Sequence, residues 1–345
     1  MGFKPITLNG KEISIHKGYK SPNFGEKNIL TDNPWNYVEF YLKRNSLSNA
    51  LFFWNQAKNF YNASELLDNV ASPLTSYYCC LNATKALLLS KSKTFSNRHG
   101  VSGWTIANRT TLNSEKVKFK NSGILSSLCL YFDEPANNEE YSLYEMMYNM
   151  PFIHRAFDLT YKSPPELFIP IQNLRFVKKN NSTEAWFCAE ICDKKYQTEH
   201  ILNKLPPTFE KDNGVTDKFI IRKKKRFKWQ SGQVNKSANL SRLTSYHKTV
   251  RKDIYCIQGR GRTWYIKRAA NINQTIIERK TATLIFAALH KLSELSRYSP
   301  DKLSKHFTCL HNWVLNDFLE LSLYQFIDTV ASEITGNEFV IPNNR

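Results

Sequence analysis

The sequence predicts an α+β protein that is predominantly helical, in which N- and C-terminal helical segments form a bundle with a β-rich basic insert. Apolar side chains recur at helical spacing on both sides of the middle third of the chain. The middle third instead holds short runs of aromatic and β-branched residues between polar loops, which favours strands. Hydrophobic residues make up 41% of the 345 residues, enough for a core, so disorder of the whole chain is excluded.

Four segments follow from these patterns. Residues 1–32 form a lead-in segment with a strand near 13–16, and residues 33–162 form an N-terminal helical region. Residues 163–272 form the β-rich basic insert, and residues 273–345 form a C-terminal helical region that packs on the N-terminal helices. Because no clean linker separates these segments, we expect one bundle with an inserted β subdomain.

The periodicity of the N-terminal region predicts amphipathic helices that begin near Trp35 and near Leu51. A third helix is predicted over about 73–90, with Ser72 as its N-cap and Pro73 in its first turn. This helix is apolar around most of its circumference, which is typical of the central helix of a bundle.

A helix over 141–161 is expected to kink or break at Pro151, because proline lacks a backbone donor. A short hairpin, or a strand that enters a helix, is predicted around 117–132, and helical periodicity returns over 275–296 and 303–334. The expected strands of the insert are 167–177, 185–191, 219–221, 254–257 and 264–266.

The insert carries most of the positive charge. Lys and Arg exceed Asp and Glu by 18 over the whole chain, and residues 215–268 hold sixteen of the basic residues against two acidic ones. Such a local excess attracts polyanions, because each neutralised phosphate releases a condensed counterion. Aromatic side chains that can stack on bases are interleaved with the charges. The residues that we expect to bind nucleic acid are Arg222, Lys223, Lys224, Lys225, Arg226, Lys228, Trp229, Arg260 and Arg262.

Other interpretations of this segment stay open. A run of charge is often a solvated loop that only keeps a protein soluble, or a surface that faces an acidic partner protein. Gly259-Arg260-Gly261-Arg262 is a flexible turn with two guanidinium groups that can surround a phosphate, but it lacks the ending of a P-loop and the third glycine of a dinucleotide fingerprint. The expected partners are therefore nucleic acid, or a protein of a multi-subunit assembly.

His99 lies at a turn, in Asn97-Arg98-His99-Gly100, where Gly100 allows a positive φ. In one interpretation, the dipole of the preceding helix favours a cationic side chain beside its C-terminus. In the other, Arg98 and His99 clamp a phosphate and donate a proton, which makes them candidate catalytic residues.

Arg297 and Tyr298 end one predicted C-terminal helix, and the Ser-Pro pair after them suits the start of the next. A structural role for this motif follows. Arg297 and Tyr298, with His306, can also project into the bundle and meet His99.

Common catalytic and metal-binding motifs are absent from the sequence. It has no Gly-x-Ser-x-Gly elbow, no His-Glu-x-x-His, no Walker A motif and no protein-kinase signature, so the motifs assign no reaction. The spaced pair Cys188 and Cys192 lacks the second pair that a structural zinc site needs, and neither a metal nor a cofactor is expected. Seven cysteines spread over this length indicate reduced thiols.

The expected location is the cytoplasm. The longest apolar run, residues 284–289, is far shorter than the roughly 18 to 20 residues of a membrane helix, and the first residues lack the apolar core of a signal peptide. We therefore expect no membrane association.

Two blocks of sequence carry a likeness to a known family. They are Ala71-Ser72-Pro73-Leu74, Tyr77-Tyr78, Leu81-Asn82-Ala83-Thr84-Lys85-Ala86-Leu87-Leu88 and His99-Gly100-Val101, and then Leu292-Ser293-Glu294-Leu295-Ser296-Arg297-Tyr298-Ser299-Pro300. In these blocks and their order, the sequence resembles the YaaC family of bacterial proteins over about residues 33–335. The resemblance implies an architecture more than a function. The helical blocks are also similar to HEPN-type bundles, many of which are ribonucleases or nucleotide-binding helpers in phage-defence and toxin systems.

The similarity to HEPN bundles implies an alternative function. HEPN ribonucleases carry an Arg followed a few residues later by a His on one helix, and the two side chains position and protonate a phosphodiester across a dimer. The stretch from Arg242 to His247 has this spacing, although it lies in the basic insert, outside the two blocks. Arg242 and His247 are therefore candidate catalytic residues.

The sequence thus predicts a cytoplasmic protein whose basic insert binds RNA or DNA, as a component of a bacterial defence or stress assembly. Localised charge is the reason to expect binding, and the family likeness alone is the reason to expect defence. The alternatives are a HEPN-like, metal-independent ribonuclease and a protein-interaction subunit with an acidic partner.

Overall fold

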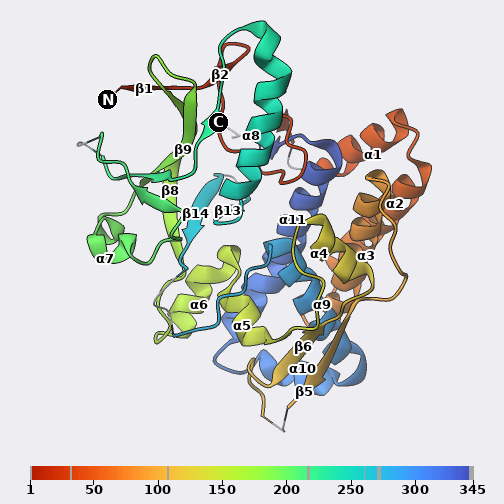
Figure 1. The fold of residues 1–345 in the computed structure, drawn as a ribbon. Coiled ribbons are helices and arrows are strands. Elements are labelled where there is room, and N and C mark those ends of the chain that lie inside the picture. The colour runs from red at the N-terminus through yellow and green to blue at the C-terminus, as the bar shows by residue number, and fades with distance from the viewer. Residues whose placement is uncertain are drawn as a thin grey trace. The chain divides into compact units, whose positions relative to one another are not determined.

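The computed structural model describes residues 2–31, 33–106, 109–215, 218–259, 261–269 and 273–341, with the backbone alone at Gln233. The chain forms two compact units (Figure 1). The sheet unit comprises residues 1–31, 166–273 and 336–345, and the helical unit comprises residues 32–165 and 274–335. The lead-in segment and the residues after 335 therefore belong with the insert, whereas the sequence predicted a separate lead-in and a helical C-terminal end.

The predicted fold class, a predominantly helical bundle, is wrong. Helices take up 44% of the chain and strands 19%, and the strands include a curled antiparallel sheet of eight. The sheet is this large because β8 (Phe168–Lys179) has hydrogen-bonding partners on both sides, β9 (Glu184–Ile191) and β14 (Thr263–Lys267). Further strands then extend the sheet from both of these neighbours.

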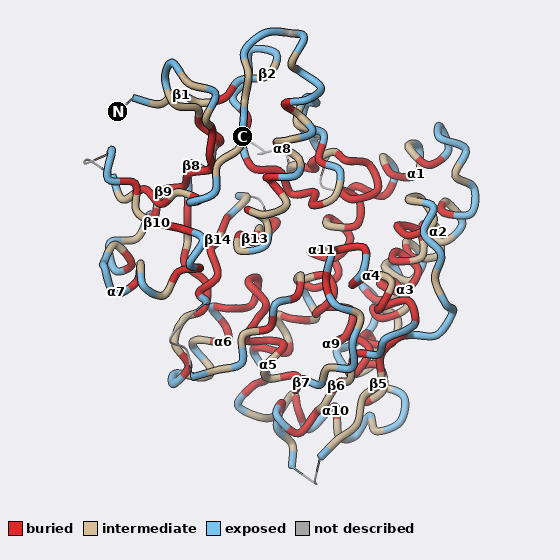
Figure 2. The backbone as a smooth tube through the Cα atoms, in the orientation of Figure 1, coloured by how far each residue is buried: buried red, intermediate tan, exposed pale blue. Residues whose placement is uncertain are grey.

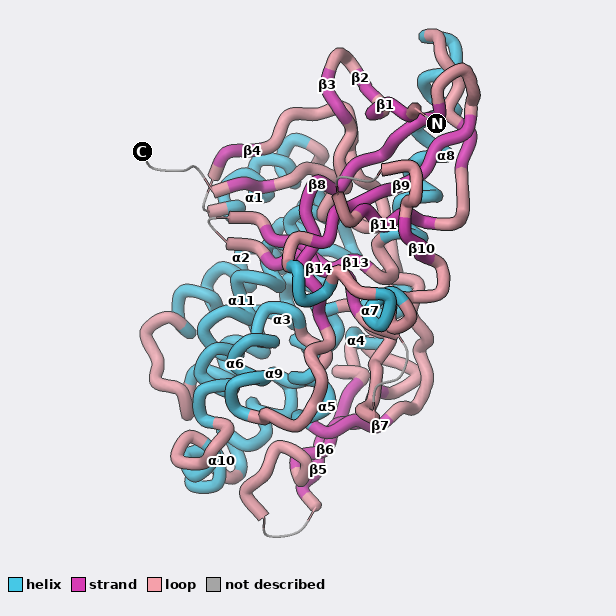
Figure 3. Tube along the Cα trace, turned by 90° about the vertical axis from the view of Figure 1, so that its left-hand side faces the viewer, coloured by secondary structure: helices cyan, strands magenta, loops and turns pink. Residues whose placement is uncertain are grey.

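In the sheet unit the strands run in the order β10-β11-β9-β8-β14-β13, with β1 paired to β8 and β12 paired to β9 (Figure 3). Two small pairs lie outside this sheet, one of them the parallel pair of β4 and β15. The remaining elements of this unit are β1 (Phe3–Pro5), β2 (Thr7–Leu8), β3 (Lys11–Glu12), β4 (Ile29–Leu30), α7 (Glu199–Leu202), β10 (Phe209–Lys211), β11 (Ile220–Lys223), β12 (Phe227–Lys228), β13 (Ile254–Ile257) and β15 (Phe339–Val340).

A helix that we did not expect, α8 (Lys236–Val250), packs on the sheet. Its buried side chains Leu243, Tyr246 and Val250 lie three or four residues apart and join the core formed by the strands. The lead-in segment belongs to the same core, because Ile6 and Ile13 are buried in it. Two separate stretches of sequence therefore contribute to this core, and a second, smaller cluster in the same unit includes Val177 and Trp186.

In the helical unit, α3 (Ser72–Ser90) packs against α2 (Ser48–Ser64), α9 (Thr281–Tyr298) and α11 (Asn312–Thr335). Figure 2 shows α3, α9 and α11 buried along most of their length. Ser72 is already inside α3, so Ala71 and not Ser72 is the N-cap residue. The other helices of this unit are α1 (Pro34–Arg44), α4 (Ile124–Tyr131), α5 (Leu143–Tyr148), α6 (His154–Thr160) and α10 (Pro300–His306).

A small antiparallel sheet of β5 (Val101–Thr105), β6 (Glu115–Phe119) and β7 (Glu140–Ser142) completes the helical unit, and β5 and β6 contact α9. Pro151 interrupts the helix as expected, since α5 ends before it and a 3-10 turn precedes α6. In the described part of the chain, no helix has both the length and the hydropathy that spanning a bilayer requires.

Candidate functional site

The basic run of residues 222–228 lies on β11, β12 and the turn between them. Arg222 faces Glu210 in the register of β10 with β11, and its Nε donates a hydrogen bond to Glu210 Oε1 at 2.8 Å. Its Nη1 donates to Asp212 Oδ1 at 3.3 Å. Opposite charges at facing positions stabilise an antiparallel pair. The charge of Arg222 is therefore already matched within the sheet.

Lys223 is only 3% exposed. Its Nζ donates to Asp253 Oδ2 at 2.7 Å and to Thr208 Oγ1 at 3.0 Å, and it lies 4.6 Å from the centre of the Phe209 ring. Burial lowers the pKa of Lys223, and Asp253 opposes that shift. A buried, paired ammonium does not reach a nucleic-acid phosphate, which corrects the expectation for Lys223.

Arg226 and Arg262 are also engaged by the protein itself. The Arg226 guanidinium lies 4.4 Å from the centre of the Trp186 ring, and its Nε is 3.6 Å from Glu184 Oε1. Arg262 Nη1 donates to Glu338 Oε2 at 2.8 Å. Among the residues expected to bind nucleic acid, four have their positive charge paired with a carboxylate of the protein itself: Arg222, Lys223, Arg226 and Arg262. Arg260 lies outside the described residues.

The rest of the basic run is open to solvent. Lys224, Lys225 and Lys228 are exposed, and none of them has an ion pair with another described residue. Trp229 is half-buried next to Phe227, at the edge of the core of the sheet unit. These four side chains lie where a ligand can reach them.

Trp229 also lines a groove of about 370 Å³, which we call the lysine groove. The groove is formed by residues 4–9, the end of β8, residues 229–232 and the start of α8. Its described lining includes Lys4, Lys178 and Lys236 and no acidic residue. These three lysines were not among the expected contacts, because they lie on three separate segments of the chain that only the fold brings together.

Neutral groups hold the groove in shape. Lys178 Nζ donates to Ser231 Oγ at 3.1 Å, and Lys236 Nζ donates to Asn9 Oδ1 at 3.2 Å, so the positive charge of both is left uncompensated. The buried Asn239 accepts from the Gln230 amide at 3.0 Å and donates to the Gln230 carbonyl at 2.7 Å. Asn239 thereby fixes the segment after Trp229 to α8.

Arg242 and His247 do not form a pair on α8. They are five positions apart, which turns the two side chains about 140° from each other around a helix. Arg242 donates to the Gln230 side chain at 3.4 Å, whereas His247 is 0% exposed and its Nε2 donates to the His16 carbonyl at 2.9 Å. This placement argues against His247 as a general acid for a polymeric substrate, because such an acid must reach the scissile bond.

In the helical unit the rings of Tyr77, His99 and His290 lie against one another, and we call these three side chains the imidazole cluster. The hydroxyl of Tyr77 contacts His99 Nδ1, and the two rings stack with centres 5.6 Å apart. The His290 ring lies 5.1 Å from that of Tyr77 and 5.7 Å from that of His99. His99 is exposed, while His290 is 5% exposed.

The loop that carries His99 is fixed by the start of α4. The Ile124 amide donates to the Arg98 carbonyl at 2.8 Å, and the Leu125 amide donates to the His99 carbonyl at 3.1 Å. Gly100 has a φ of +79°, as expected, and a Cβ on Gly123 would lie 2.4 Å from Gly100. His99 thus lies at the N-terminus of α4 and not at the C-terminus of α3, which overturns the helix-dipole interpretation. Arg98 contributes its carbonyl, and its side chain is exposed.

Arg297 is exposed and does not project into the bundle as one interpretation of the sequence expected, but its charge affects the imidazole cluster. The pKa of His99 is lowered by burial and then by Arg297 and Lys85. Burial, followed by His99 and Arg297, lowers the pKa of His290 to about 3. His290, Glu294 and Arg297 have the i, i+4, i+7 spacing of one helical face, a signal by which the sequence could have revealed His290.

Tyr298 and His306 do not join this cluster. Tyr298 is 75% exposed, and the centre of its ring lies 5.2 Å from the Arg297 guanidinium carbon. Tyr298 therefore contacts Arg297 on the solvent side. His306 Nε2 lies 3.3 Å from Glu115 Oε1. The expectation that His306 meets His99 is therefore wrong.

Glu115 is fully buried among cations. Lys291 and Lys302 each approach its carboxylate at 3.1 Å, and His306 lies on the same oxygen as Lys302. Burial alone would raise the pKa of Glu115, but the hydrogen bonds from His306 and Thr105 and the charge of Lys291 lower it to about 2. This arrangement is a structural centre, because no oxygen of the carboxylate is open to a ligand.

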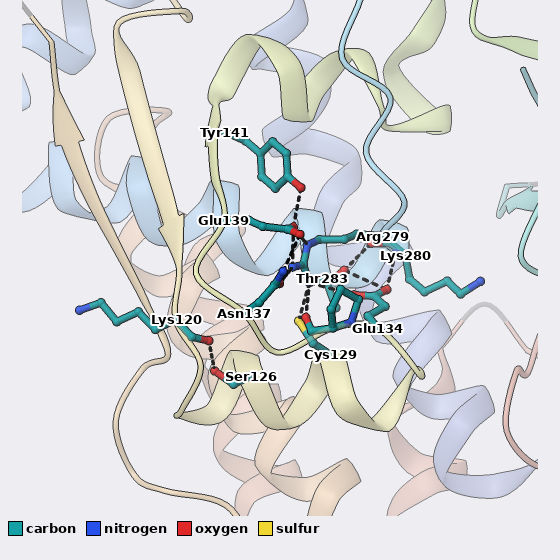
Figure 4. A network of polar contacts seen from close by, with 11 residues as sticks. Lys120, Ser126, Cys129, Glu134, Asn137, Glu139, Tyr141, Arg279, Lys280 and Thr283 are labelled. Carbon is teal, nitrogen blue, oxygen red and sulfur yellow. Dashed lines mark hydrogen bonds and ion pairs between the residues drawn. The ribbon is translucent and has the colours of Figure 1, made fainter. Parts of the chain in front are cut away.

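A second buried network, centred on Arg279, fixes the start of α9 (Figure 4). Arg279 Nη2 donates to Glu139 Oε2 at 2.8 Å, and Nη1 lies 3.6 Å from Glu134 Oε2. The Lys280 amide donates to Glu134, whose pKa is raised by burial to about 7. Arg279 is thus paired with both Glu134 and Glu139, and the network positions α9 and with it His290 and Arg297.

The fold and these sites define a mixed α+β protein with a positively charged groove on its sheet unit and an imidazole cluster in its helical unit. The described residues include no group of His, Cys, Asp and Glu side chains suited to a metal ion.

The chain belongs to the family described as YaaC-like protein, whose model matches residues 22–334. No curated protein and no solved structure matches the chain.

Proposed function

We propose that the protein binds a single strand of RNA or DNA through its sheet unit, with the lysine groove and the neighbouring Lys224, Lys225 and Lys228 as the contact surface. The observation that carries this proposal is the uncompensated charge of Lys4, Lys178 and Lys236 beside Trp229. Single-strand binders combine a cationic track with aromatic faces on which bases stack.

The contacts have separate roles in this proposal. The lysines supply affinity without sequence preference, because they meet phosphates. Trp229 supplies a stacking face, and stacking on an aromatic ring is worth about 1–3 kcal/mol per base. Binding is therefore strongly salt dependent and tolerant of sequence.

Membership of a bacterial defence or stress assembly, in the cytoplasm, is the finer part of the proposal and rests on the likeness of the helical blocks to HEPN bundles. We do not propose a ribonuclease that uses Arg242 and His247, since the two side chains diverge and His247 is enclosed.

The test measures fluorescence anisotropy of a labelled oligonucleotide without terminal phosphates, in both RNA and DNA form. The double variant Lys178→Gln/Lys236→Gln is expected to weaken binding by about tenfold or more at moderate salt. The matched control Lys93→Gln/Lys162→Gln removes two exposed lysines from the helical unit and leaves affinity unchanged. Equal loss in both variants, or no binding by the native protein at low salt, contradicts the proposal and leaves an acidic protein as the partner.

A further inference from the structure

The imidazole cluster belongs to the helical unit and shares no residue with the contact surface that we propose on the sheet unit. Tyr77 comes from α3, His99 from the loop before β5, and His290 from α9. His99 and Arg297 are both exposed, so a small molecule can reach the outer side of the cluster from solvent.

Tyr77 sets the proton position on His99. Tyr77 is 0% exposed, and burial raises the pKa of its hydroxyl far above the usual range, so the hydroxyl keeps its proton. His99 Nδ1 is the only hydrogen-bond partner of this hydroxyl among the described residues, so we assign the hydroxyl proton to that contact and the ring proton of neutral His99 to Nε2. His99 therefore presents an N–H donor away from Tyr77.

His290 is buried with an unsatisfied nitrogen. Its Nδ1 has no hydrogen-bond partner among the described residues, and the nearest carboxylate oxygen, Glu294 Oε1, is 3.8 Å away. Glu294 is instead held by the Gly103 amide at 3.4 Å. A buried polar atom without a partner is unfavourable, and such atoms concentrate where a ligand or a reaction supplies the missing contact.

The cluster carries an excess of positive charge. Lys291 is matched by Glu115 at 3.1 Å, and Lys85 lies over the Phe53 ring at 4.9 Å without a carboxylate. The charged and titratable groups that face the two imidazoles are Tyr77 and Lys85 from α3, Lys120 from the turn before α4, and Lys291, Glu294 and Arg297 from α9. With Lys291 matched, three cations face one carboxylate, an excess of two positive charges.

We infer that the imidazole cluster and Arg297 form a binding site for a phosphate monoester, with His99 Nε2 and the Arg297 guanidinium as the donors to its oxygens. A monoester carries a charge of about −1.5 to −2 near neutral pH and three strong acceptor oxygens, which match the local charge excess and the donor set. A diester, with a single negative charge, fits the excess less well.

Binding is coupled to proton uptake. In the free protein, burial, Arg297 and Lys85 keep the pKa of His99 below its ordinary value, so the ring is neutral at pH 7. A bound dianion offsets these cations and raises the pKa of His99. The complex then takes up a proton near neutral pH, and binding weakens as the pH rises above neutrality.

Isothermal titration calorimetry of the full chain tests the site. The probes are inorganic phosphate, adenosine 5′-monophosphate and adenosine, and a 5′-phosphorylated oligonucleotide is compared with its unphosphorylated form to separate a chain end from a free nucleotide. We expect phosphate and the monophosphate to bind and adenosine not to bind. Repeating the titration in buffers of different ionisation enthalpy measures the expected proton uptake.

The variants Arg297→Gln and His99→Asn are expected to weaken binding of the monophosphate by about tenfold or more, and Arg297→Lys by less, because lysine keeps the charge but not the bidentate geometry. The matched control Arg44→Gln removes an exposed arginine at the end of α1 and leaves binding unchanged. Circular dichroism checks that each variant is folded. If Arg297→Gln does not fold, His99→Asn provides the test of the site.

Absence of binding by native protein at about 10 mM phosphate or monophosphate overturns the inference, as does equal binding by Arg297→Gln and Arg44→Gln. The outcome is independent of the proposed function. Lys178→Gln/Lys236→Gln should keep monophosphate binding, and Arg297→Gln should keep binding of the unphosphorylated oligonucleotide.

Discussion

The basic run on β11 and the lysine groove are two cationic regions of the same unit, and they differ in what surrounds the charge. Arg222, Lys223 and Arg226 stand on or next to a paired strand, where neighbouring strands and loops bring carboxylates to them. The lysines of the groove come from separate elements and meet only neutral oxygens. The region with the higher density of charge in the sequence therefore has a smaller fraction of its charge available.

The difference shows why clustering along the chain is a weak measure of a binding surface. A strand places its neighbours in register, so a basic strand next to acidic ones forms ion pairs. Lysines that converge from β8, α8 and the lead-in segment have no such partners among the described residues. Whether a charge is available to a ligand depends on whether the protein already compensates it, and three pairs of substitutions test that rule.

The largest effect is expected where a charge is most completely compensated, at Glu115 in the helical unit. Glu115→Gln leaves the buried Lys291 without a counter-charge, and we expect the free energy of unfolding to fall by about 3–5 kcal/mol. The control Glu140→Gln removes an exposed partner of Lys118 and should cost no more than about 1 kcal/mol. Urea unfolding measures both.

The pH dependence sharpens this test. The pKa of Glu115 is about 2 in the folded protein and about 4.3 in an unfolded chain, so its contribution to stability is complete above about pH 4.3 and is lost as the pH falls toward 2. Glu115→Gln should remove this part of the acid sensitivity. A variant whose stability falls with acid as steeply as that of the native protein contradicts the assignment.

A smaller effect separates two adjacent lysines. Lys223→Ala breaks the buried pair with Asp253 and should lower the free energy of unfolding by about 3 kcal/mol, whereas Lys224→Ala should change it by less than about 0.5 kcal/mol. The midpoint of urea unfolding gives both values. Similar losses at the two positions would mean that Lys223 is not the buried ion that its contacts indicate.

The smallest expected effect is on the salt dependence of nucleic-acid binding, and it distinguishes a lysine without a carboxylate partner from an arginine that has one. If each groove lysine meets one phosphate, Lys236→Gln should reduce the slope of log affinity against log salt for a single strand by about 0.7. Arg222→Gln should leave that slope unchanged, because Arg222 already pairs with Glu210 and Asp212. A larger change at Arg222 than at Lys236 reverses the comparison and would return the binding surface to the basic run.

Much of the helical unit could be predicted from the sequence, since the apolar spacing of α3 and α9 repeats over five turns of helix or more. The helix α8 was missed because its three core positions are spread among basic and polar side chains. The pairing of β1 with β8 was also beyond the sequence, because a strand of three residues carries too little pattern to identify its partner.

The site was predictable only in part. Arg297 was expected near His99, and the structure shows its electrostatic effect on that imidazole, while His290 was hidden in an apolar helix whose periodicity drew attention to packing. The compensation of Arg222 depends on the register of β10 and β11, which single-sequence patterns do not specify.

The interleaving of the two units has a consequence for how the molecule is made. The chain passes from one unit to the other at residues 31–32, 165–166, 273–274 and 335–336. The strand β4 can pair only after β15, more than 300 residues later in the sequence, has been synthesised. During synthesis the helical unit can complete its packing before the sheet unit receives its last strand. Neither unit corresponds to one continuous stretch of the coding sequence, so a single cut of the gene anywhere between the codons for residues 32 and 335 would divide both.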